Sequence, residues 1–329
     1  MNHWYRRSVL AWLLWPASLV FALAVSIRRL LYRVRLLKSE HPGVQVIVVG
    51  NLVAGGSGKT PLVLWIAQFL KSKGWSPAIV SRGYGAAESR PQAATITSEA
   101  SQVGDEPIIL SRRGGCPVWV GADRVAVIRA LWTKDVDVLI LDDGLQHYRL
   151  RRDIEIAVVD GRGFGNGFLH PAGPLREPVS RLGSVDAVVS NGAAISRKGA
   201  FSMSLEGDTF HRMTDANDRR PAAAFAGQKV HAVAGIGDPN RFFLHLRALG
   251  IKAIPHSFPD HHPFTPRDLE AVTSSDPSLP VVMTEKDAVK LRRAAQAHWW
   301  VLPVSAKLDP AFGDWLLGKL GNRQKKRAE

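Results

Sequence analysis

The sequence predicts an α/β fold in which a mostly parallel sheet is flanked by helices. Apolar runs rich in β-branched residues, such as 46–49 and 136–141, recur along the chain and have the composition of strands covered on both faces. Patterns of helical periodicity follow these runs, and glycine-rich turns join the two. Repeated strand-then-helix units favour parallel strands with crossover helices on both faces of the sheet.

Length, charge and cysteine content narrow the class of protein. A chain of 329 residues can bury a sizeable core and is long enough for two domains. The formal net charge of +14 predicts an anionic partner, which would be nucleic acid, acidic phospholipid or a phosphorylated substrate. Cys116 is the only cysteine, which excludes an intramolecular disulfide and a zinc site built from several thiolates.

The N-terminal stretch 9–27 contains no charged residue and, as a helix, has about the length needed to cross the hydrocarbon core of a bilayer. We expect a membrane anchor here, and Pro16 leaves open a re-entrant or interfacial course. A cleaved signal peptide, indicated by the small residues Ala22 and Ala24, and a buried core helix are the alternatives.

The segment 28–38, RRLLYRVRLLK, alternates basic and apolar residues and predicts an amphipathic basic helix suited to anionic inner-membrane lipids. More positive charge follows the apolar stretch than precedes it, which predicts that the body of the protein lies on the cytoplasmic side of the inner membrane. Because the basic residues gather beside this stretch rather than in an aromatic-lined groove, nucleic acid is not an expected partner.

Residues 44–60 predict a buried strand, a glycine-rich turn and the start of a helix. Glycine tolerates positive φ and has no Cβ, so such a turn can point its backbone N–H groups at an anion. Lys59 can then reach the β- and γ-phosphates of ATP, and the Thr60 hydroxyl can bind Mg²⁺. The predicted nucleotide-binding residues are Gly55, Gly56, Ser57, Gly58, Lys59 and Thr60. The sequence therefore predicts a P-loop NTPase-type domain that uses ATP and Mg²⁺.

This loop departs from the pattern G-x-x-x-x-G-K-[ST] at its first position, where Val53 stands in place of glycine. We expect Gly55 and Gly56 to supply the flexibility instead. The helix that follows, from 61 to about 71, would point the positive end of its dipole at the phosphates. Because ATP is cytosolic, a nucleotide site that begins at residue 50 argues against the cleaved signal peptide.

Two pairs of acids are candidates for the chemistry. Asp142 and Asp143 end the apolar strand 136–141, and a strand end is where phosphate-loop sites carry the carboxylate that holds Mg²⁺. Asp105 and Glu106 precede an apolar helix, so capping of that helix competes with a role as a base or as an Mg²⁺ ligand.

Two further motifs lie in loops. Arg176, in the proline-framed stretch 171–178, is a candidate phosphate clamp, with a salt-bridged loop as the alternative. His261 lies in FPDHHPF (258–264), where adjacent histidines point apart, so we expect a catalytic or orienting role with an aspartate rather than a metal site. The predicted organisation is an anchor (1–39), a P-loop domain (40–205), a linker (206–228) and a smaller C-terminal α/β domain (229–329).

Taken together, the motifs resemble the tetraacyldisaccharide 4′-kinase family, the lipid A 4′-kinases. In family order they are GNLVAGGSGKTP (50–61), SRGYG (81–85), VGDEP (103–107), LDDGLQH (141–147), PAGPLREP (171–178), FPDHHPF (258–264) and MTEKDAVK (283–290). The resemblance spans nearly the whole chain. It implies a membrane-bound kinase of lipopolysaccharide biosynthesis that moves the γ-phosphate of ATP to the 4′-hydroxyl of a tetraacylated glucosamine disaccharide 1-phosphate, a lipid A precursor.

The resemblance also implies roles for single residues. Asp105 matches the family's candidate general base, and His261 matches its partner across the domain cleft, where it could relay the proton. The positions that match the ATP and Mg²⁺ residues are Lys59, Thr60, Asp142 and Asp143. Further positions expected around the cleft, as candidate substrate contacts, are Glu106, Gln146, His147, Arg176 and Glu177.

One alternative is a membrane-associated P-loop NTPase switch that hydrolyses nucleotide to drive a protein partner. The switch predicts hydrolysis that a protein stimulates, whereas the kinase predicts transfer of phosphate to a lipid. We expect the kinase to be a monomer.

Overall fold

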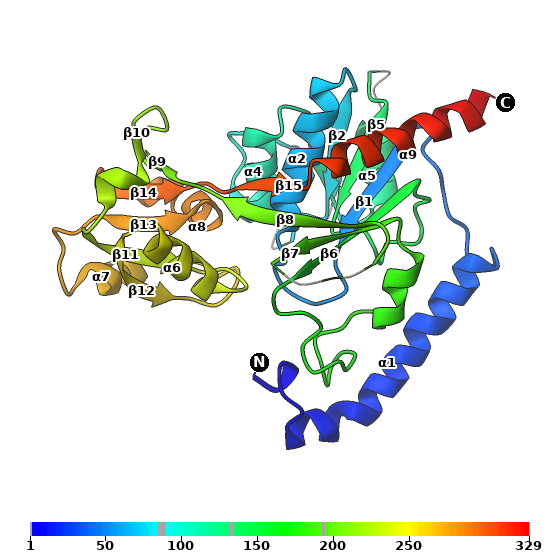
Figure 1. Cartoon of the computed structure of the whole chain (residues 1–329), viewed down its shortest axis with the longest axis horizontal. Coiled ribbons are helices and arrows are strands. Elements are labelled where there is room, and N and C mark those ends of the chain that lie inside the picture. Colours follow the sequence, from blue (N-terminus) through cyan, green and yellow to red (C-terminus); the bar gives the residue numbers. More distant parts are fainter. Residues whose placement is uncertain (1, 85–89, 132–134, 193–194, 196, 329) are drawn as a thin grey trace.

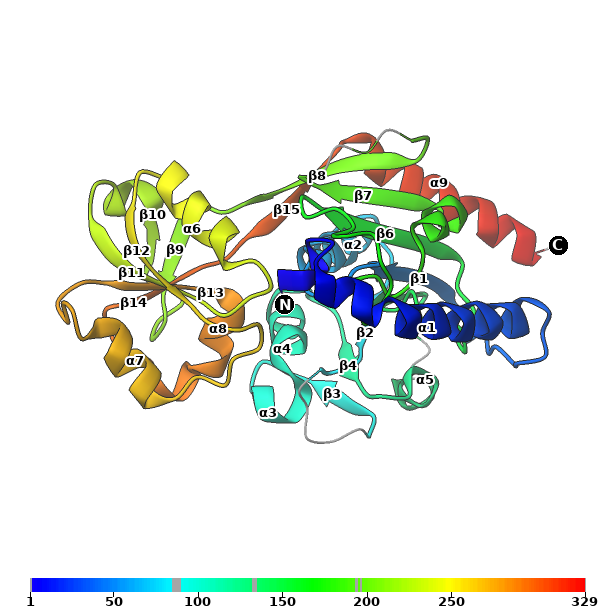
Figure 2. The same ribbon diagram turned by 90° about the horizontal axis from the view of Figure 1, so that it is seen from below.

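The computed structural model describes residues 2–84, 90–131, 135–192, 195 and 197–328, and it has two lobes and a long N-terminal helix (Figure 1). Gly85, the last residue of the motif SRGYG, lies outside the described residues. The large lobe holds a nine-stranded sheet and the small lobe a six-stranded sheet. The chain leaves the large lobe after β8 (Ala200–Glu206) and re-enters it at β15 (Ser305–Leu308), and both views show this connection (Figure 2).

The large sheet has the strand order β15-β8-β7-β6-β1-β5-β2-β4-β3, and only the pairs β15–β8 and β3–β4 at its two edges are antiparallel. Its other strands are β1 (Gln45–Gly50), β2 (Pro77–Ser81), β3 (Gln92–Ala94), β4 (Val118–Val120), β5 (Val138–Asp142), β6 (Ile154–Asp160) and β7 (Ala187–Asn191). Along β1, Ile47 and Val49 face one core while Val46 and Val48 face the other. This alternation explains why the central strands are apolar throughout.

Helices cover both faces of the large sheet, which confirms the predicted α/β fold. The helices α2 (Lys59–Ser72), α4 (Asp105–Arg113) and α9 (Ala311–Ala328) pack on one face, and α5 (Arg124–Leu131) packs on the other. The short elements α3 (Ala100–Val103) and η2 (Val179–Ser184) lie in the connections.

The small lobe is a second α/β unit with the strand order β10-β9-β14-β13-β11-β12. Its strands are β9 (Thr209–Arg212), β10 (Arg219–Pro221), β11 (Lys229–Ala234), β12 (Lys252–Ser257), β13 (Val281–Thr284) and β14 (Trp299–Leu302). Its helical elements are η3 (Ala222–Phe225), α6 (Pro239–Ala248), α7 (Pro266–Thr273), α8 (Glu285–Lys290) and η4 (Arg292–Ala294). The strands β11 to β14 are parallel to one another, and β9 and β10 add an antiparallel edge.

Two expected boundaries differ from the structure. Residues 206–228, expected as a linker, contain β9, β10 and η3, and Phe210 is fully buried in the core of the small lobe. Residues 305–328, expected in the C-terminal domain, return to the large lobe, where β15 pairs with β8 and α9 buries Phe312 and Leu316. Short polar strands carry little periodicity, which explains why 206–228 resembled a linker.

The N-terminal helix α1 (Val9–Arg33) begins after Ser8, whose hydroxyl accepts a hydrogen bond from the N–H of Ala11 (3.3 Å). Among the helices that the structure describes, α1 is the one long and apolar enough to cross a membrane, and only 11% of its most apolar window is buried. Large apolar side chains such as Trp12 and Leu13 are exposed on it.

Polar contacts hold α1 along the large lobe. The Ser18 hydroxyl donates to the carbonyl oxygen of Leu169 (2.8 Å) and accepts from the N–H of Ala172 (3.0 Å). Near the other end of the helix, Nε of Arg29 lies 3.7 Å from the carboxylate of Glu177. The helix therefore lies beside the lobe over most of its length, as both views show (Figures 1 and 2).

The basic helix expected over 28–38 ends early, at Arg33. Arg35 takes a φ of 64°, and the N–H of Leu37 donates to the carbonyl oxygen of Leu31 (3.1 Å), which closes the last turn. Residues 34–37 therefore follow the helix as a turn.

The small lobe contains a buried histidine pair. Fully buried His231 has Nε2 3.0 Å from the carbonyl oxygen of Asp276 and Nδ1 3.0 Å from Nε2 of His256. Because a carbonyl oxygen only accepts, Nε2 of His231 donates, and its Nδ1 accepts the N–H of His256. Burial lowers the pKa of His256, and the nearby His231, which would repel a second positive charge once protonated, lowers it further.

We expect the free energy of unfolding to fall as the pH drops below about 6.5, the ordinary histidine pKa. Below that pH, His256 binds a proton more readily in the unfolded chain than in the folded one, so acid favours unfolding. Above that pH, His256 is neutral in both states, and its contribution to the free energy of unfolding is fully present. Urea unfolding on both sides of this pH measures the slope, with His256→Gln as the comparison. If His256→Gln showed the same pH dependence of the free energy of unfolding as the wild type, His256 would not be its cause.

Candidate active site

The turn between β1 and α2 has the shape of an anion-binding loop. Gly55 and Gly58 have φ of 98° and 91°, and a Cβ on Gly58 would lie 2.5 Å from Nδ2 of Asn191. Nδ2 of Asn51 donates to the Gly55 carbonyl oxygen and to the Ser57 hydroxyl, both at 3.1 Å. Nδ2 of Asn191 donates to the Ser57 carbonyl oxygen at the same distance. The loop is thus fixed at the N-terminus of α2, where unpaired N–H groups favour an anion.

Asp143 is held between two cations just after β5. Its carboxylate lies 3.6 Å from Nζ of Lys59 and accepts hydrogen bonds of 2.9 and 3.1 Å from Arg176. Burial raises the pKa of Asp143, but the charges of Lys59 and Arg176 outweigh burial and lower the pKa to about 2. Asp143 is therefore ionised, and it fixes the ammonium group of Lys59 beside the loop.

Asp142, the last residue of β5, has a different environment from its neighbour. Its Oδ2 accepts a hydrogen bond from the Ser81 hydroxyl (3.2 Å), while its buried Oδ1 has no hydrogen-bond partner among the described residues. Burial and the negative charge of Glu106 raise its pKa to about 7, against the charge of Lys59. A buried carboxylate oxygen without a partner is costly, so this atom is suited to bind a cation.

A second group of polar residues joins the two lobes. Asp105, the first residue of α4, accepts the N–H of Glu106 at Oδ1 (2.9 Å), and its Oδ2 lies 3.1 Å from Nδ1 of His261. The same carboxylate therefore satisfies a backbone N–H in the first turn of α4 and pairs with the histidine. Burial raises the pKa of Asp105, but the hydrogen bond from His261 and the charges of Lys286 and Lys290 outweigh burial and keep the pKa below its usual value.

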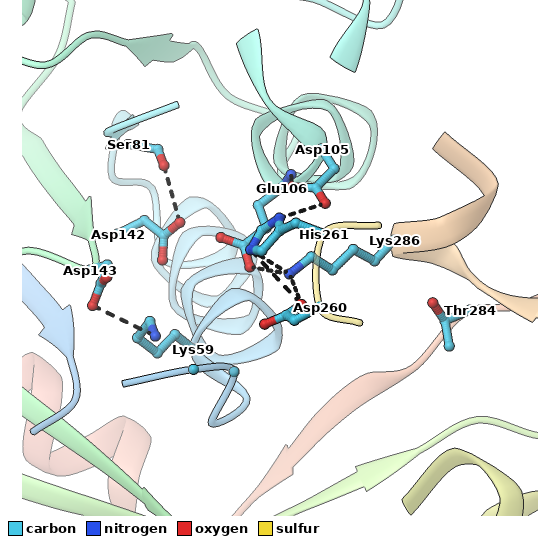
Figure 3. Close-up of polar contacts among 12 residues, drawn as sticks. Lys59, Ser81, Asp105, Glu106, Asp142, Asp143, Asp260, His261, Thr284 and Lys286 are labelled. Carbon is cyan, nitrogen blue, oxygen red and sulfur yellow. Dashed lines mark hydrogen bonds and ion pairs between the residues drawn. The ribbon is translucent and has the colours of Figure 1, made fainter. Parts of the chain in front are cut away.

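Lys286, in α8, was not predicted as a site residue, although it lies in the charged turn MTEKDAVK (283–290). Its Nζ lies 3.1 Å from Oδ1 of Asp260, 3.2 Å from Oε1 of Glu106 and 3.2 Å from Nε2 of His261 (Figure 3). Burial lowers the pKa of Lys286, but the surrounding carboxylates, Glu106 foremost, raise it overall. The sequence signals for this residue were its charged turn between a strand and a helix and its place in one of the motifs of the family resemblance.

Gln146 and Glu177 form a buried network with the phosphate loop. Nε2 of Gln146 donates to the carbonyl oxygen of Asn51 (3.2 Å) and to Glu177 (3.0 Å). Glu177 is fully buried, and the hydroxyl of Tyr148 donates to it. Because Arg29 of α1 lies beside the same carboxylate, the network links the loop to the N-terminal helix.

His147 is a neutral histidine near the strand-end acids. Burial and the positive charges of Arg124 and Arg152 lower its pKa to about 4. Its buried Nε2 has no hydrogen-bond partner in the part of the chain that the structure describes. Such an atom can accept a hydrogen bond from a bound hydroxyl, or donate one, according to the tautomer.

The start of the chain also reaches the phosphate loop. Arg162 donates to the carbonyl oxygen of Gly56, and its other Nη lies 3.4 Å from the hydroxyl of Tyr5. The indole N–H of Trp4 donates to the carbonyl oxygen of Pro171 (3.1 Å). The residues before α1 therefore lie beside the loop.

The predicted residues gather in two adjacent groups. One group, at the loop, comprises Lys59, Thr60, Asp142, Asp143 and Arg176, and the other, at the lobe junction, comprises Asp105, Glu106 and His261. Figure 3 shows Glu106 between the groups, and its charge acts on both Asp142 and Lys286. Among the described residues no cluster of three or more His, Cys, Asp or Glu could hold a metal ion. A cation at the loop would therefore share its coordination between carboxylate, hydroxyl and phosphate oxygens.

Comparison with known proteins adds independent support. The model of the family described as tetraacyldisaccharide-1-P 4′-kinase matches residues 10–321. The tetraacyldisaccharide 4′-kinase of Nitrosococcus oceani is 47% identical over 99% of this chain and 96% of that protein, and the one of Azoarcus sp. is 46% identical over 97% and 94%. The crystal structure of LpxK from Aquifex aeolicus in complex with ATP is 28% identical, with a TM-score of 0.79 over 95% of this chain and 100% of that one. The chain therefore belongs to the tetraacyldisaccharide-1-phosphate 4′-kinase family.

Proposed function

We propose that this chain transfers the γ-phosphoryl group of ATP to the 4′-hydroxyl of a tetraacylated glucosamine disaccharide 1-phosphate. Family membership supports the reaction. One observation carries the chemistry. Asp105, an ionised carboxylate that pairs with His261, lies across from the phosphate-binding loop, and Glu106 lies between the two (Figure 3). A loop alone would serve hydrolysis, whereas an ionised carboxylate beside it provides a proton acceptor for a hydroxyl.

The phosphate loop and Lys59 bind the β- and γ-phosphates. Phosphoryl transfer depends on positioning and on neutralising charge, and a fixed ammonium group contributes to both. Asp143 orients Lys59, and Arg176 in turn holds Asp143. We therefore assign Arg176 and Asp143 to the support of Lys59.

The residues present also fit a magnesium ion. The unpartnered oxygen of Asp142 lies at a strand end beside the loop, and Thr60 is the second residue of α2. We assign the ion to Thr60 and Asp142, with Asp143 in the supporting position described above. When bound, Mg²⁺ neutralises charge on the β- and γ-phosphate oxygens.

Asp105 accepts the proton of the sugar hydroxyl. The bond from the 4′-oxygen to phosphorus forms as the bond from phosphorus to ADP breaks, and the hydroxyl proton passes to the carboxylate. Because the transition state of phosphoryl transfer is loose, little proton removal is needed early, and a weak base is sufficient. We assign the sugar to His147, whose buried Nε2 has no partner among the described residues, and to Glu106, which lies between the two groups. Gln146 and Glu177, which bond to each other, are assigned to the support of the loop through Asn51.

The helix α1 fits an acceptor that stays in the membrane. Exposing acyl chains to water costs about 0.8 kcal/mol per CH₂, so an enzyme that acts on such a lipid gains by lying on the bilayer. The residues before α1 lie beside the phosphate loop through Tyr5 and Arg162, and Arg29 near the end of the helix contacts the large lobe. We therefore propose that α1 lies in the interface of the inner membrane, on the cytoplasmic side. Because one chain supplies both Asp105 and His261, we propose a monomer.

Anionic lipids would hold the basic end of α1. Replacing Arg28, Arg33, Arg35 and Lys38 with glutamine is expected to weaken binding to anionic vesicles by roughly fivefold per residue, because each basic residue near the surface contributes about 1 kcal/mol. Vesicle co-sedimentation measures this effect. A control variant, Lys229→Gln with Lys252→Gln, removes two exposed charges from the small lobe and should bind normally. Equal losses per residue replaced in the two variants would point to net charge instead of this segment.

The proposed function is tested by following the γ-phosphate. The purified full-length protein is incubated with γ-labelled ATP, Mg²⁺ and the disaccharide lipid in mixed micelles. Label in the lipid is the expected result. Label only in free phosphate, increased by a protein partner rather than by lipid, would favour the NTPase switch.

A further inference from the structure

We infer that Lys286 is a positioning residue that holds His261 as the neutral tautomer with its proton on Nδ1, so that His261 donates to Asp105 and does not relay a proton. The inference rests on the proposed function and adds a residue to it. It follows from which atoms at the lobe junction can donate a hydrogen bond and which can accept one.

Because of Lys286, Nε2 of His261 can only accept a hydrogen bond. An ammonium group has only donors, and Nζ of Lys286 lies 3.2 Å from Nε2, so Nε2 must accept and carries no proton. The same ammonium lies 3.1 Å from Asp260 and 3.2 Å from Glu106, which supplies a partner for each of its N–H bonds. The Lys286 side chain is 13% exposed, so water competes little for these positions.

With Nε2 unprotonated, His261 carries its proton on Nδ1, which lies 3.1 Å from Oδ2 of Asp105. A carboxylate accepts this hydrogen bond, and a doubly protonated imidazole would turn an N–H toward the ammonium of Lys286. The groups around the pair are Asp105, Glu106, Asp260, Lys286, Lys290 and the ring of Tyr84, whose centroid lies 4.9 Å from that of His261.

This tautomer is incompatible with the proton relay expected from the sequence. A relay requires Nδ1 to accept a proton from Asp105 while Nε2 releases one. Here Nδ1 already bears a proton, and Nε2 has none to release and is covered by Lys286. The proton of the hydroxyl therefore stays on Asp105 during transfer, and His261 orients and stabilises the carboxylate.

The tautomer can be measured without substrate, so failure of this inference is separable from failure of the proposed function. In full-length protein with ¹⁵N-labelled histidine, in detergent at neutral pH, the His261 signals are identified by their loss in His261→Asn. We expect a protonated Nδ1 and an unprotonated Nε2. A proton on Nε2 of the wild-type protein would overturn the inference.

Lys286→Met tests the part played by the ammonium group. Without it, Nε2 lies beside the carboxylates of Asp260 and Glu106 with no ammonium group to donate to it, so the neighbouring charge no longer opposes a proton on Nε2. We expect kcat to fall by about tenfold to a hundredfold with little change in the KM for ATP, and to acquire a new acidic limb. Lys286→Arg, which keeps a charged donor, should restore most of kcat. A wild-type tautomer and pH profile in Lys286→Met would overturn the inference.

Two substitutions at His261 separate donation from relay. The amide of asparagine can replace the Nδ1 donor but cannot carry a proton, and asparagine tolerates the φ of 61° at this position. We expect His261→Asn to keep kcat about tenfold or more above that of His261→Ala, since a hydrogen bond to a charged group is retained. Equal loss of activity in the two variants, with ATP binding intact in both, would instead support a relay.

Discussion

Replacing Asp105 with asparagine is expected to lower kcat by about 10²–10⁴-fold, the usual contribution of a general base, with ATP binding close to that of the wild type. The amide oxygen of asparagine can still accept the N–H of Glu106, so the first turn of α4 keeps this hydrogen bond. The group that accepts the hydroxyl proton is lost. Single-turnover transfer of labelled phosphate to lipid measures this loss apart from product release.

Asp268 provides a matched control for that experiment. Its carboxylate lies 3.2 Å from Nε2 of His262, so Asp268→Asn changes a partly buried aspartate–histidine pair that lies outside the proposed site, and the amide oxygen can still accept from Thr265 in the capping box of α7. We expect near-normal kcat in this variant. Wild-type kcat in Asp105→Asn, or equal losses in the two variants, would contradict the assignment of Asp105 as the base.

Replacing Lys59 with methionine is expected to lower kcat by about 10²–10³-fold and to weaken ATP binding as well. Methionine keeps most of the length of the side chain but removes the charge that faces the phosphates. Asp143 loses its ion pair with Lys59 but keeps the closer one with Arg176. Turnover and the affinity for a non-hydrolysable ATP analogue measure the two effects separately.

Lys71, at the far end of the same helix, is the control for Lys59. Its Nζ donates to the carbonyl oxygen of Gly115, away from the loop. Lys71→Met should keep near-normal turnover and ATP affinity. Wild-type turnover in Lys59→Met would contradict the role assigned to Lys59 in phosphoryl transfer.

The sequence was most informative where the site is local. The strand, the turn and the first helical residues of 44–60 are contiguous, so their arrangement follows from one pattern. Asp142 lies near the loop because β1 and β5 are parallel neighbours that end at the same edge, with Val49 beside Asp142. Adjacent acids in the sequence did not reveal that Asp142 keeps a free oxygen while Asp143 is held by cations, because those partners come from other elements.

The contacts that the site makes between the two lobes could not be predicted from local sequence patterns. Asp105 and His261 are 156 positions apart, and only the resemblance to a family paired them. Lys286 was visible as a charge in a turn, but its partners Glu106 and Asp260 depend on how the lobes pack. A site assembled across two lobes leaves no signature in the periodicity of either.

The same limit applies to the fold. Phe312, Leu316 and Leu320 repeat every fourth residue and predict a buried helical face, but nothing local tells which lobe covers it. The structure places that face against the large lobe, beyond the boundary expected for the C-terminal domain. The short strands β9 and β10 were missed because their residues alternate too briefly to show a period.

The most direct test of the central claim compares two lipids that differ at one hydroxyl. The full-length protein is given ATP and Mg²⁺ with either the tetraacylated disaccharide 1-phosphate or its 4′-deoxy analogue, and the lipid products are analysed by phosphorus NMR. The account predicts a new phosphomonoester signal, coupled to the proton at the 4′ position, for the first lipid and no new phosphate on the analogue. A new phosphate on a different hydroxyl, or any phosphate added to the analogue, would contradict it.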